Sequence, residues 1–149
     1  MTPTDGPAID EESVIRLRNA VLRVARRLRT SGDPEDLTAT QSSVLTTLVR
    51  QGPMRAGDLA QAEALNPTLL SRVLAHLEER GLASRGPDPG DGRATIARAT
   101  PGGRRLVERL RERRAALLVD WLEGLTPEGR TSLLAALPAL EELAEGARG

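Results

Sequence analysis

The 149-residue chain has no cysteine, lysine, phenylalanine or tyrosine, and it has one tryptophan and one histidine. Without cysteine it cannot form disulfides, thiolate zinc sites or a thiol redox switch. A single histidine argues against histidine-rich metal sites and against a Ser-His catalytic pair. The longest apolar runs, such as residues 115–119, have five residues, fewer than a membrane-spanning helix needs. We therefore expect no metal site and no membrane span.

The composition is that of one ordinary globular domain. Hydrophobic residues make up 39% of the chain and charged residues 28%, which excludes a disordered or fibrous protein. The N-terminal segment before the first predicted helix is acidic and lacks the apolar stretch of a secretion signal. The expected location is therefore the cytoplasm.

Catalytic patterns are also missing. No pair of carboxylates lies in an apolar segment, no nucleophile has a base beside it, and no glycine-rich loop follows a strand. Gly102-Gly103 marks the start of a helix and not a phosphate-binding loop. We expect no enzymatic activity and no cofactor.

Charge is distributed unevenly, although the formal net charge is zero. Residues 50–114 carry 13 arginines and 8 acidic residues, a net charge of +5. Residues 115–149 have a net charge of −4 and residues 1–49 of −1. A basic middle segment between acidic flanks favours a local anionic partner such as nucleic acid. A genomic bias toward arginine is the alternative explanation of the same pattern.

A first helix is predicted from Asp10 to Thr30, with Asp10 as its N-cap and acidic residues in its first turn. Its apolar residues recur at spacings of three and four, the pattern of a narrow seam that pairs with another helix. The seam residues are Val14, Leu17, Val21, Val24 and Leu28.

Three further helices are predicted before residue 81. A capping box at Thr38 begins the first, and Gly52 ends it. A short helix over residues 56–65 follows a two-residue connector at residues 54–55. Asn66-Pro67 begins the third helix, which runs to Arg80 before a C-terminal glycine. The apolar side of this third helix is made of Leu70, Val73, Leu74 and Leu77.

The next segment combines a turn with two flanking strands. Residues 82–86 and 94–99 surround a turn over residues 87–93 that is rich in proline, aspartate and glycine. This turn chemistry predicts a two-stranded ribbon. Thr100-Pro101 then caps a long helix that runs to about Glu123. Thr126-Pro127 begins a last, leucine-rich helix that Pro138 is expected to kink or divide.

This order of elements predicts a mainly α fold with a small β-ribbon, which is the winged helix-turn-helix layout. The helix over residues 67–80 buries its apolar side and leaves a polar side free. The first two turns of that polar side hold hydroxyl and guanidinium groups and no acid, as expected for groups that read base edges in a major groove. The predicted DNA-contacting residues on this helix are Thr68, Ser71, Arg72 and His76.

Residues 37–103 resemble the MarR (multiple antibiotic resistance regulator) family of bacterial transcription factors. The resemblance rests on the order and spacing of several short matches and on no single strong motif. The matching segments are residues 37–41, 44–45, 58–60, 71–72, 77–82, Arg85, 88–93 and 99–103. It implies a winged helix-turn-helix DNA-binding lobe over residues 33–100, and a helical dimerisation lobe formed by residues 1–32 together with 101–149.

The resemblance also implies roles in the wing. In this family an Asp-x-Arg motif sends the arginine into the minor groove while the aspartate holds the loop, and here those roles fall to Asp91 and Arg93. The negative potential of a narrow minor groove attracts arginine. Arg85, from the matching segments, joins the DNA-contacting residues. Gly92 stands where the family usually has a second basic residue, a departure expected to loosen the wing.

The implied function is a homodimeric regulator that binds a pseudo-palindromic operator in double-stranded DNA and represses a nearby promoter. The resemblance further implies a small-molecule effector, held in a pocket between the two lobes. The expected dimer interface comprises Val14, Leu17, Val21, Val24, Leu28, Leu133, Leu137 and Leu140. The alternative is a winged-helix protein-interaction module that does not bind DNA, which an exposed Leu69 would favour.

Overall fold

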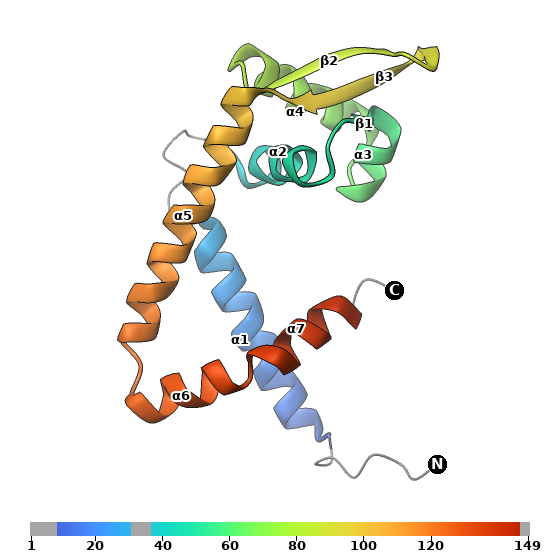
Figure 1. Cartoon of the computed structure of the whole chain (residues 1–149). Coiled ribbons are helices and arrows are strands. Elements are labelled where there is room, and N and C mark those ends of the chain that lie inside the picture. The colour runs from blue at the N-terminus through green and yellow to red at the C-terminus, as the bar shows by residue number, and fades with distance from the viewer. Residues whose placement is uncertain (1–8, 31–36, 147–149) are drawn as a thin grey trace. The chain divides into compact units, whose positions relative to one another are not determined.

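The computed structural model describes residues 9–30 and 37–146 (Figure 1). The elements in these ranges are α1 (Glu11–Thr30), α2 (Ala39–Gln51), β1 (Met54–Arg55), α3 (Ala56–Ala62), α4 (Pro67–Glu79), β2 (Ala83–Asp88), β3 (Asp91–Ala99), α5 (Pro101–Glu123), α6 (Pro127–Ala135) and α7 (Leu137–Gly146). The chain divides into two units, one up to Leu110 and one from Arg111 onward. The predominance of helices with one small sheet confirms the predicted fold class. The predicted lobe boundary between residues 32 and 33 lies outside the described residues.

Side-chain caps begin the helices where the sequence predicts them. At α2, Thr38 accepts from the Gln41 N–H at 3.2 Å, and the Gln41 side chain accepts from the Thr38 N–H at 2.9 Å, which completes a capping box. At α4, the Asn66 side chain accepts from the Leu69 N–H at 2.8 Å. The predicted caps at residues 10, 100 and 126 are formed as well. These starts are local, so the sequence alone specifies them.

Two turns use the left-handed backbone region. Gly81, which follows α4, has φ of +67°, as expected of a glycine that ends a helix. Ala64, in the turn between α3 and α4, has φ of +52°, a conformation that costs an alanine about 1 kcal/mol. Pro138 lies in the first turn of α7, so the predicted last helix is divided into α6 and α7.

The sheet has three antiparallel strands in the order β1-β3-β2 (Figure 1), and the prediction of a two-stranded ribbon was therefore incomplete. The segment expected to be a connector forms β1, which pairs Met54 with Ala97 and Arg55 with Ile96. Two residues are too few to show the alternating pattern of a strand, so β1 could not be predicted from residue periodicity. Because β1 precedes α3 directly, it joins the sheet to the helix-turn-helix.

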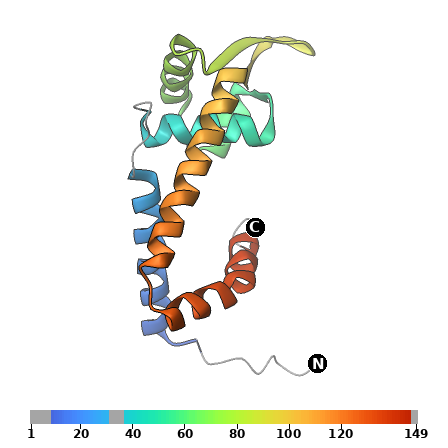
Figure 2. The ribbon, with the colours of Figure 1, turned by 60° about the vertical axis from the view of Figure 1, so that its left-hand side comes forward.

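The hairpin of β2 and β3, here called the wing, is longer than predicted (Figure 2). Only residues 89–90 separate the strands, so Pro87 and Arg93, both predicted to lie in the turn, belong to strands. A proline is tolerated in β2 because that strand is at the edge of the sheet. The pairing passes from Pro87–Thr95 directly to Asp88–Asp91. Residues 92–94, with Arg93 at their centre, therefore form a bulge without partners on β2.

One hydrophobic core joins α2, α3, α4, the sheet and the first turns of α5. Its largest fully buried side chains are Val44, Leu45, Leu48, Leu59, Leu70, Leu74, Leu77 and Leu106. The predicted apolar side of α4 is buried throughout, as expected. Gly103 lets α5 pack closely against the backbone of Leu82, just before β2, because a Cβ at Gly103 would overlap the Leu82 carbonyl oxygen.

The helices α1, α6 and α7 contain no buried residue along their described lengths. The seam residues Val14, Leu17, Val21 and Val24 on α1 are each 45–48% exposed, and Leu28 is half-buried. On α6 and α7, Leu133 and Leu137 are exposed and Leu140 is half-buried. The only tryptophan of the sequence, Trp121, is half-buried in the part of α5 that belongs to the second unit. The assignment of the seam and the leucines to a dimer interface stays a prediction.

Candidate nucleic-acid interface

The helix α4 presents one side to solvent and buries the other. Thr68, Leu69, Ser71 and Arg72 are exposed, and His76 is half-buried. The Asn66 cap and Pro67 fix where the helix begins, and the four buried apolar residues fix its rotation about its own axis. The structure thus places all four predicted contact residues of this helix outside the core.

The electrostatics of this outer side suit an anion. The first turn of α4 contains no acidic residue. The helix dipole places positive partial charge at this end, where backbone N–H groups also point outward. The formal charge of Arg72 lies within the same two turns. A shallow, open depression lies on this side of α4. Its lining residues are Pro67, Thr68, Ser71, Arg72 and Ala75.

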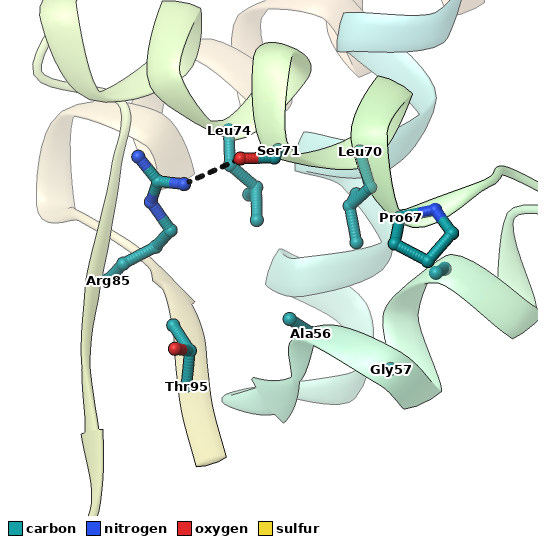
Figure 3. Close-up of a pocket in the computed structure, with 9 residues that line it drawn as sticks. Ala56, Gly57, Pro67, Leu70, Ser71, Leu74, Arg85 and Thr95 are labelled. Atoms are coloured by element: carbon teal, nitrogen blue, oxygen red, sulfur yellow. Dashed lines mark hydrogen bonds between the residues drawn. The ribbon is translucent and has the colours of Figure 1, made fainter. Parts of the chain in front are cut away.

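The Arg85 side chain, on β2, links the wing to α4 (Figure 3). Its Nε and Nη2 donate to Glu78 Oε2 at 2.9 and 2.7 Å, and its backbone N–H donates to Glu78 Oε1 at 2.7 Å. Its Nη1 donates to the Ser71 hydroxyl at 3.4 Å. The Arg85 guanidinium holds the pKa of Glu78 below its ordinary value, although desolvation acts in the opposite direction. Ser71 and Arg85, both predicted site residues, are therefore brought together.

A small pocket opens beside this contact, between α3, α4 and the two wing strands (Figure 3). Its volume is about 190 Å³. Its lining is mostly apolar, with polar groups from Ser71, Arg85 and Thr95. The full lining is Ala56, Gly57, Ala60, Pro67, Leu70, Ser71, Leu74, Arg85 and Thr95.

The other two predicted residues lie toward the tip of the wing. Asp91 and Arg93 are exposed, and the Asp91 carboxylate accepts from the Arg93 N–H at 3.1 Å. This bond agrees with a loop-holding role for the aspartate. Neither residue takes part in the Ser71–Arg85 contact at the base of the wing.

Sequence reasoning missed two residues that hold the wing, namely Glu78 and Arg55. Arg55 forms an ion pair with Asp88, with its Nη2 2.6 Å from Asp88 Oδ2. Both pairs join residues on different elements, so helical or strand periodicity gives no sign of them. Among the described residues, no three His, Asp or Glu side chains gather as a metal ion would require.

The chain is similar to known regulators along most of its length. It is 36% identical over 124 residues to the HTH-type transcriptional regulator ML2140 of Mycobacterium leprae, which covers 83% of this chain and 87% of that protein. The profile of the MarR family matches residues 37–95. The chain belongs to the MarR family.

Solved structures agree with the MarR assignment. The transcriptional regulator Tm0710 from Thermotoga maritima is 25% identical, covers 93% of this chain and 97% of that one, and has a TM-score of 0.76. Bordetella bronchiseptica BpsR, whose DNA binding is regulated by 6-hydroxynicotinic acid, is 28% identical, covers 88% and 99%, and has a TM-score of 0.59. The protein is thus a DNA-binding, winged helix-turn-helix transcriptional regulator. In the described ranges of this MarR-family protein, no helix is both long and apolar enough to cross a bilayer.

Proposed function

We propose that this protein is a homodimeric, sequence-specific repressor that acts in the cytoplasm and has no enzymatic activity. Each subunit places α4 in a major groove of a pseudo-palindromic operator, and the bound dimer blocks a promoter. The observation that carries the proposal is the outer side of α4, where exposed hydroxyl and guanidinium groups stand on a rigid, capped helix without a competing acid in its first turn.

Arg72 is the principal reading residue in this proposal. An arginine can bind O6 and N7 of guanine with two hydrogen bonds, which makes it the side chain most suited to direct readout. Thr68 and Ser71 reach bases or phosphates from the same two turns, and His76 contacts the groove one turn further on. Arg85 supports this surface by holding Ser71 and Glu78, two residues of the same helix.

The wing supplies a second contact. Arg93 is exposed near the hairpin tip, and Asp91 holds its backbone. A guanidinium inserted into a narrow minor groove gains from the concentrated negative potential there. We assign Arg93 to this contact, and Asp91 to its support.

The dimer is formed by apolar surface that each subunit leaves uncovered. We place the interface on the α1 seam and on Leu133, Leu137 and Leu140. Full burial of a valine or leucine contributes about 1.5–3 kcal/mol. Seam residues that are nearly half exposed therefore retain roughly half of that gain for a partner.

A small-molecule effector relieves repression in this proposal. The DNA binding of the similar protein BpsR is regulated by a small hydroxylated aromatic acid. The 190 Å³ pocket beside Ser71 and Arg85 is large enough for a single ring, since a cavity of roughly 150 Å³ already admits benzene. A ligand in this pocket would disturb the contact between the wing and α4.

Selection from a random duplex pool with the purified protein tests the function. We expect enrichment of an inverted repeat whose half-sites are centred about one helical turn apart. Arg72→Ala should then abolish discrimination between the enriched duplex and a scrambled one. Arg50→Ala removes the same charge from an exposed position at the end of α2 and should keep discrimination.

Two outcomes would contradict the proposal at different levels. Unchanged discrimination by Arg72→Ala would remove the assigned reading surface but leave DNA binding in place. Failure to enrich any repeat would favour the protein-interaction module, with the exposed Leu69 as its apolar anchor.

A further inference from the structure

The hairpin ladder does not fix the position of Arg93. Residues 92–94 lie in the bulge that the strand pairing skips, so no β2 residue is paired with Arg93. Its backbone N–H donates to the carboxylate of Asp91, a neighbour on the same strand, at 3.1 Å. The bulge can therefore move as a unit unless its outer end is tied to another part of the fold.

Asp88 provides such a tie at the outer end of the bulge. It is the last residue of β2, is paired with Asp91 across the turn, and is only 9% exposed. Its Oδ1 accepts from the Gly90 N–H at 2.9 Å, which fixes the turn. Its Oδ2 accepts from the Arg55 Nε at 2.7 Å and lies 2.6 Å from Arg55 Nη2. One carboxylate thus joins the tip of the wing to a residue 33 positions earlier.

The chemistry of this carboxylate favours the paired state. The Gly90 N–H and the Arg55 guanidinium hold the pKa of Asp88 below its ordinary value, against the effect of desolvation. Asp88 is therefore ionised near neutral pH, and its attraction to Arg55 persists under physiological conditions.

Arg55 occupies a position where a different residue type would serve the helix better. It is the N-cap of α3, and its side chain forms no capping hydrogen bond. Serine, threonine, aspartate or asparagine would cap the helix and are the preferred residues there. The arginine instead reaches from β1, an edge strand of the sheet, to Asp88 at the end of β2. Its contact with Asp88 therefore gives a reason for an arginine at this position, whereas capping of α3 gives none.

We propose that the Arg55–Asp88 ion pair, here called the wing clamp, is a positioning device that sets where Arg93 meets DNA. The clamp anchors the outer end of the bulge to the β1–α3 junction, and hence to the same core that orients α4. The proposal rests on the proposed function, because it assumes that Arg93 contacts DNA at the minor groove. Arg55 and Asp88 act through Arg93 and are not themselves DNA contacts.

Removing either charge of the ion pair distinguishes the wing clamp from a general effect of net charge on DNA binding. Arg55→Gln removes a positive charge, and Asp88→Asn removes a negative charge while keeping an acceptor for the Gly90 N–H. If only net charge mattered, Asp88→Asn would strengthen DNA binding and Arg55→Gln would weaken it. The clamp predicts that both variants weaken binding, because both release the bulge.

The experiment measures binding of a fluorescein-labelled random-sequence duplex across a salt series, with wild type and each variant. Arg55→Gln and Asp88→Asn should each weaken binding about fivefold per wing at 0.15 M salt and reduce the log–log salt slope by about one per wing, the contribution of one phosphate contact. In an Arg93→Ala background, neither substitution should cause a further change. Arg50→Gln, an exposed arginine in the same unit, serves as the charge-matched control for Arg55→Gln.

Each outcome decides the matter. Tighter binding by Asp88→Asn, or an Arg55→Gln effect that persists without Arg93, would overturn the clamp while leaving the proposed function intact. No effect of Arg93→Ala itself would remove the wing contact and the clamp together. Absence of DNA binding by the wild type even at low salt would overturn the proposed function first, and the clamp with it.

Amide resonances measured without DNA separate a local release of the bulge from misfolding of the variants. The amide resonances of Gly92 and Arg93 should shift or broaden in Arg55→Gln and Asp88→Asn, while those of α4 stay in place. Unchanged resonances at the bulge in both variants would contradict the clamp whatever the binding data show.

Discussion

The winged helix-turn-helix region of residues 37–110, here called the body, differs from the helices α1, α6 and α7 in how far its apolar residues are buried. The body buries its leucines almost completely around one core, whereas α1, α6 and α7 leave theirs partly exposed and bury none along their described lengths. Side-chain caps nevertheless begin α1 and α6, as they begin α2 and α4. Local signals therefore specify helices in both regions, and the difference between them is how far the rest of the described chain covers their apolar side chains.

The largest expected effect comes from overpacking at Gly103, where α5 packs closely against the backbone of Leu82. Gly103→Ala places a Cβ against the Leu82 carbonyl oxygen and within 3.0 Å of the Leu45 side chain. We expect a loss of about 3 kcal/mol in the free energy of unfolding, at the upper end of overpacking penalties. Urea denaturation followed by circular dichroism measures it.

Gly57→Ala is the matched control in this experiment. Its Cβ would meet nothing within 4 Å on the exposed side of α3, and its φ is not left-handed. We expect this variant to gain about 0.5–1 kcal/mol, because alanine favours a helix over glycine. Equal effects of the two substitutions would show that Gly103 is not a point of close packing.

A smaller effect is expected on the exposed helices, and it should appear in association and not in folding. Val21→Asp places a carboxylate in the middle of the α1 seam, and we expect it to weaken dimer association by about 1–3 kcal/mol, which is about fivefold to 150-fold. Sedimentation velocity at several protein concentrations measures the shift. Asn19→Asp adds the same charge to α1 outside the seam and should leave association nearly unchanged. A seam variant that dimerises like wild type would place the interface elsewhere.

The smallest effect concerns the join between the wing and α4. Because the folded-state pKa of Glu78 is lowered, its pair with Arg85 stabilises the protein fully above the unfolded pKa of about 4.3 and is lost as the pH falls through the lower folded value. At pH 7 the free energy of unfolding of wild type should exceed that of Glu78→Gln by up to about 1 kcal/mol. The difference is small because both side chains of the pair are partly exposed. The difference should shrink below about pH 4.3.

Thermal unfolding of both proteins from pH 7 to pH 3 tests this dependence. Glu79→Gln, at the exposed neighbouring position, should show no such difference. A gap between wild type and Glu78→Gln that is constant over the whole pH range would mean that the carboxylate does not act through its charge.

The sequence was sufficient wherever one residue and its near neighbours decide the structure. The caps at Thr38 and Asn66, the left-handed Gly81 and the division of the last helix at Pro138 were all predicted, because each depends on a side chain acting within a few residues. The outward placement of Arg72 followed from the spacing of the buried leucines on the same helix.

The sequence was insufficient wherever segments distant in the chain meet. Strand β1 exists only because Met54 and Arg55 pair with β3, more than forty residues later. The extent of the wing strands was misjudged, since proline and glycine normally end strands and here lie on an edge that tolerates them. The pairs Arg55–Asp88 and Arg85–Glu78 likewise join separate elements, so only tertiary structure reveals that the wing is held at both its base and its tip.

The half-buried Trp121 lies in the second unit, and the sequence has no tyrosine or phenylalanine. Intrinsic fluorescence therefore arises entirely from α5 beyond Leu110, and α4 and the wing contribute no fluorescence. A single tryptophan introduced into the wing of a Trp121→Leu variant would consequently report on insertion of the wing into a DNA groove, without fluorescence from any other side chain.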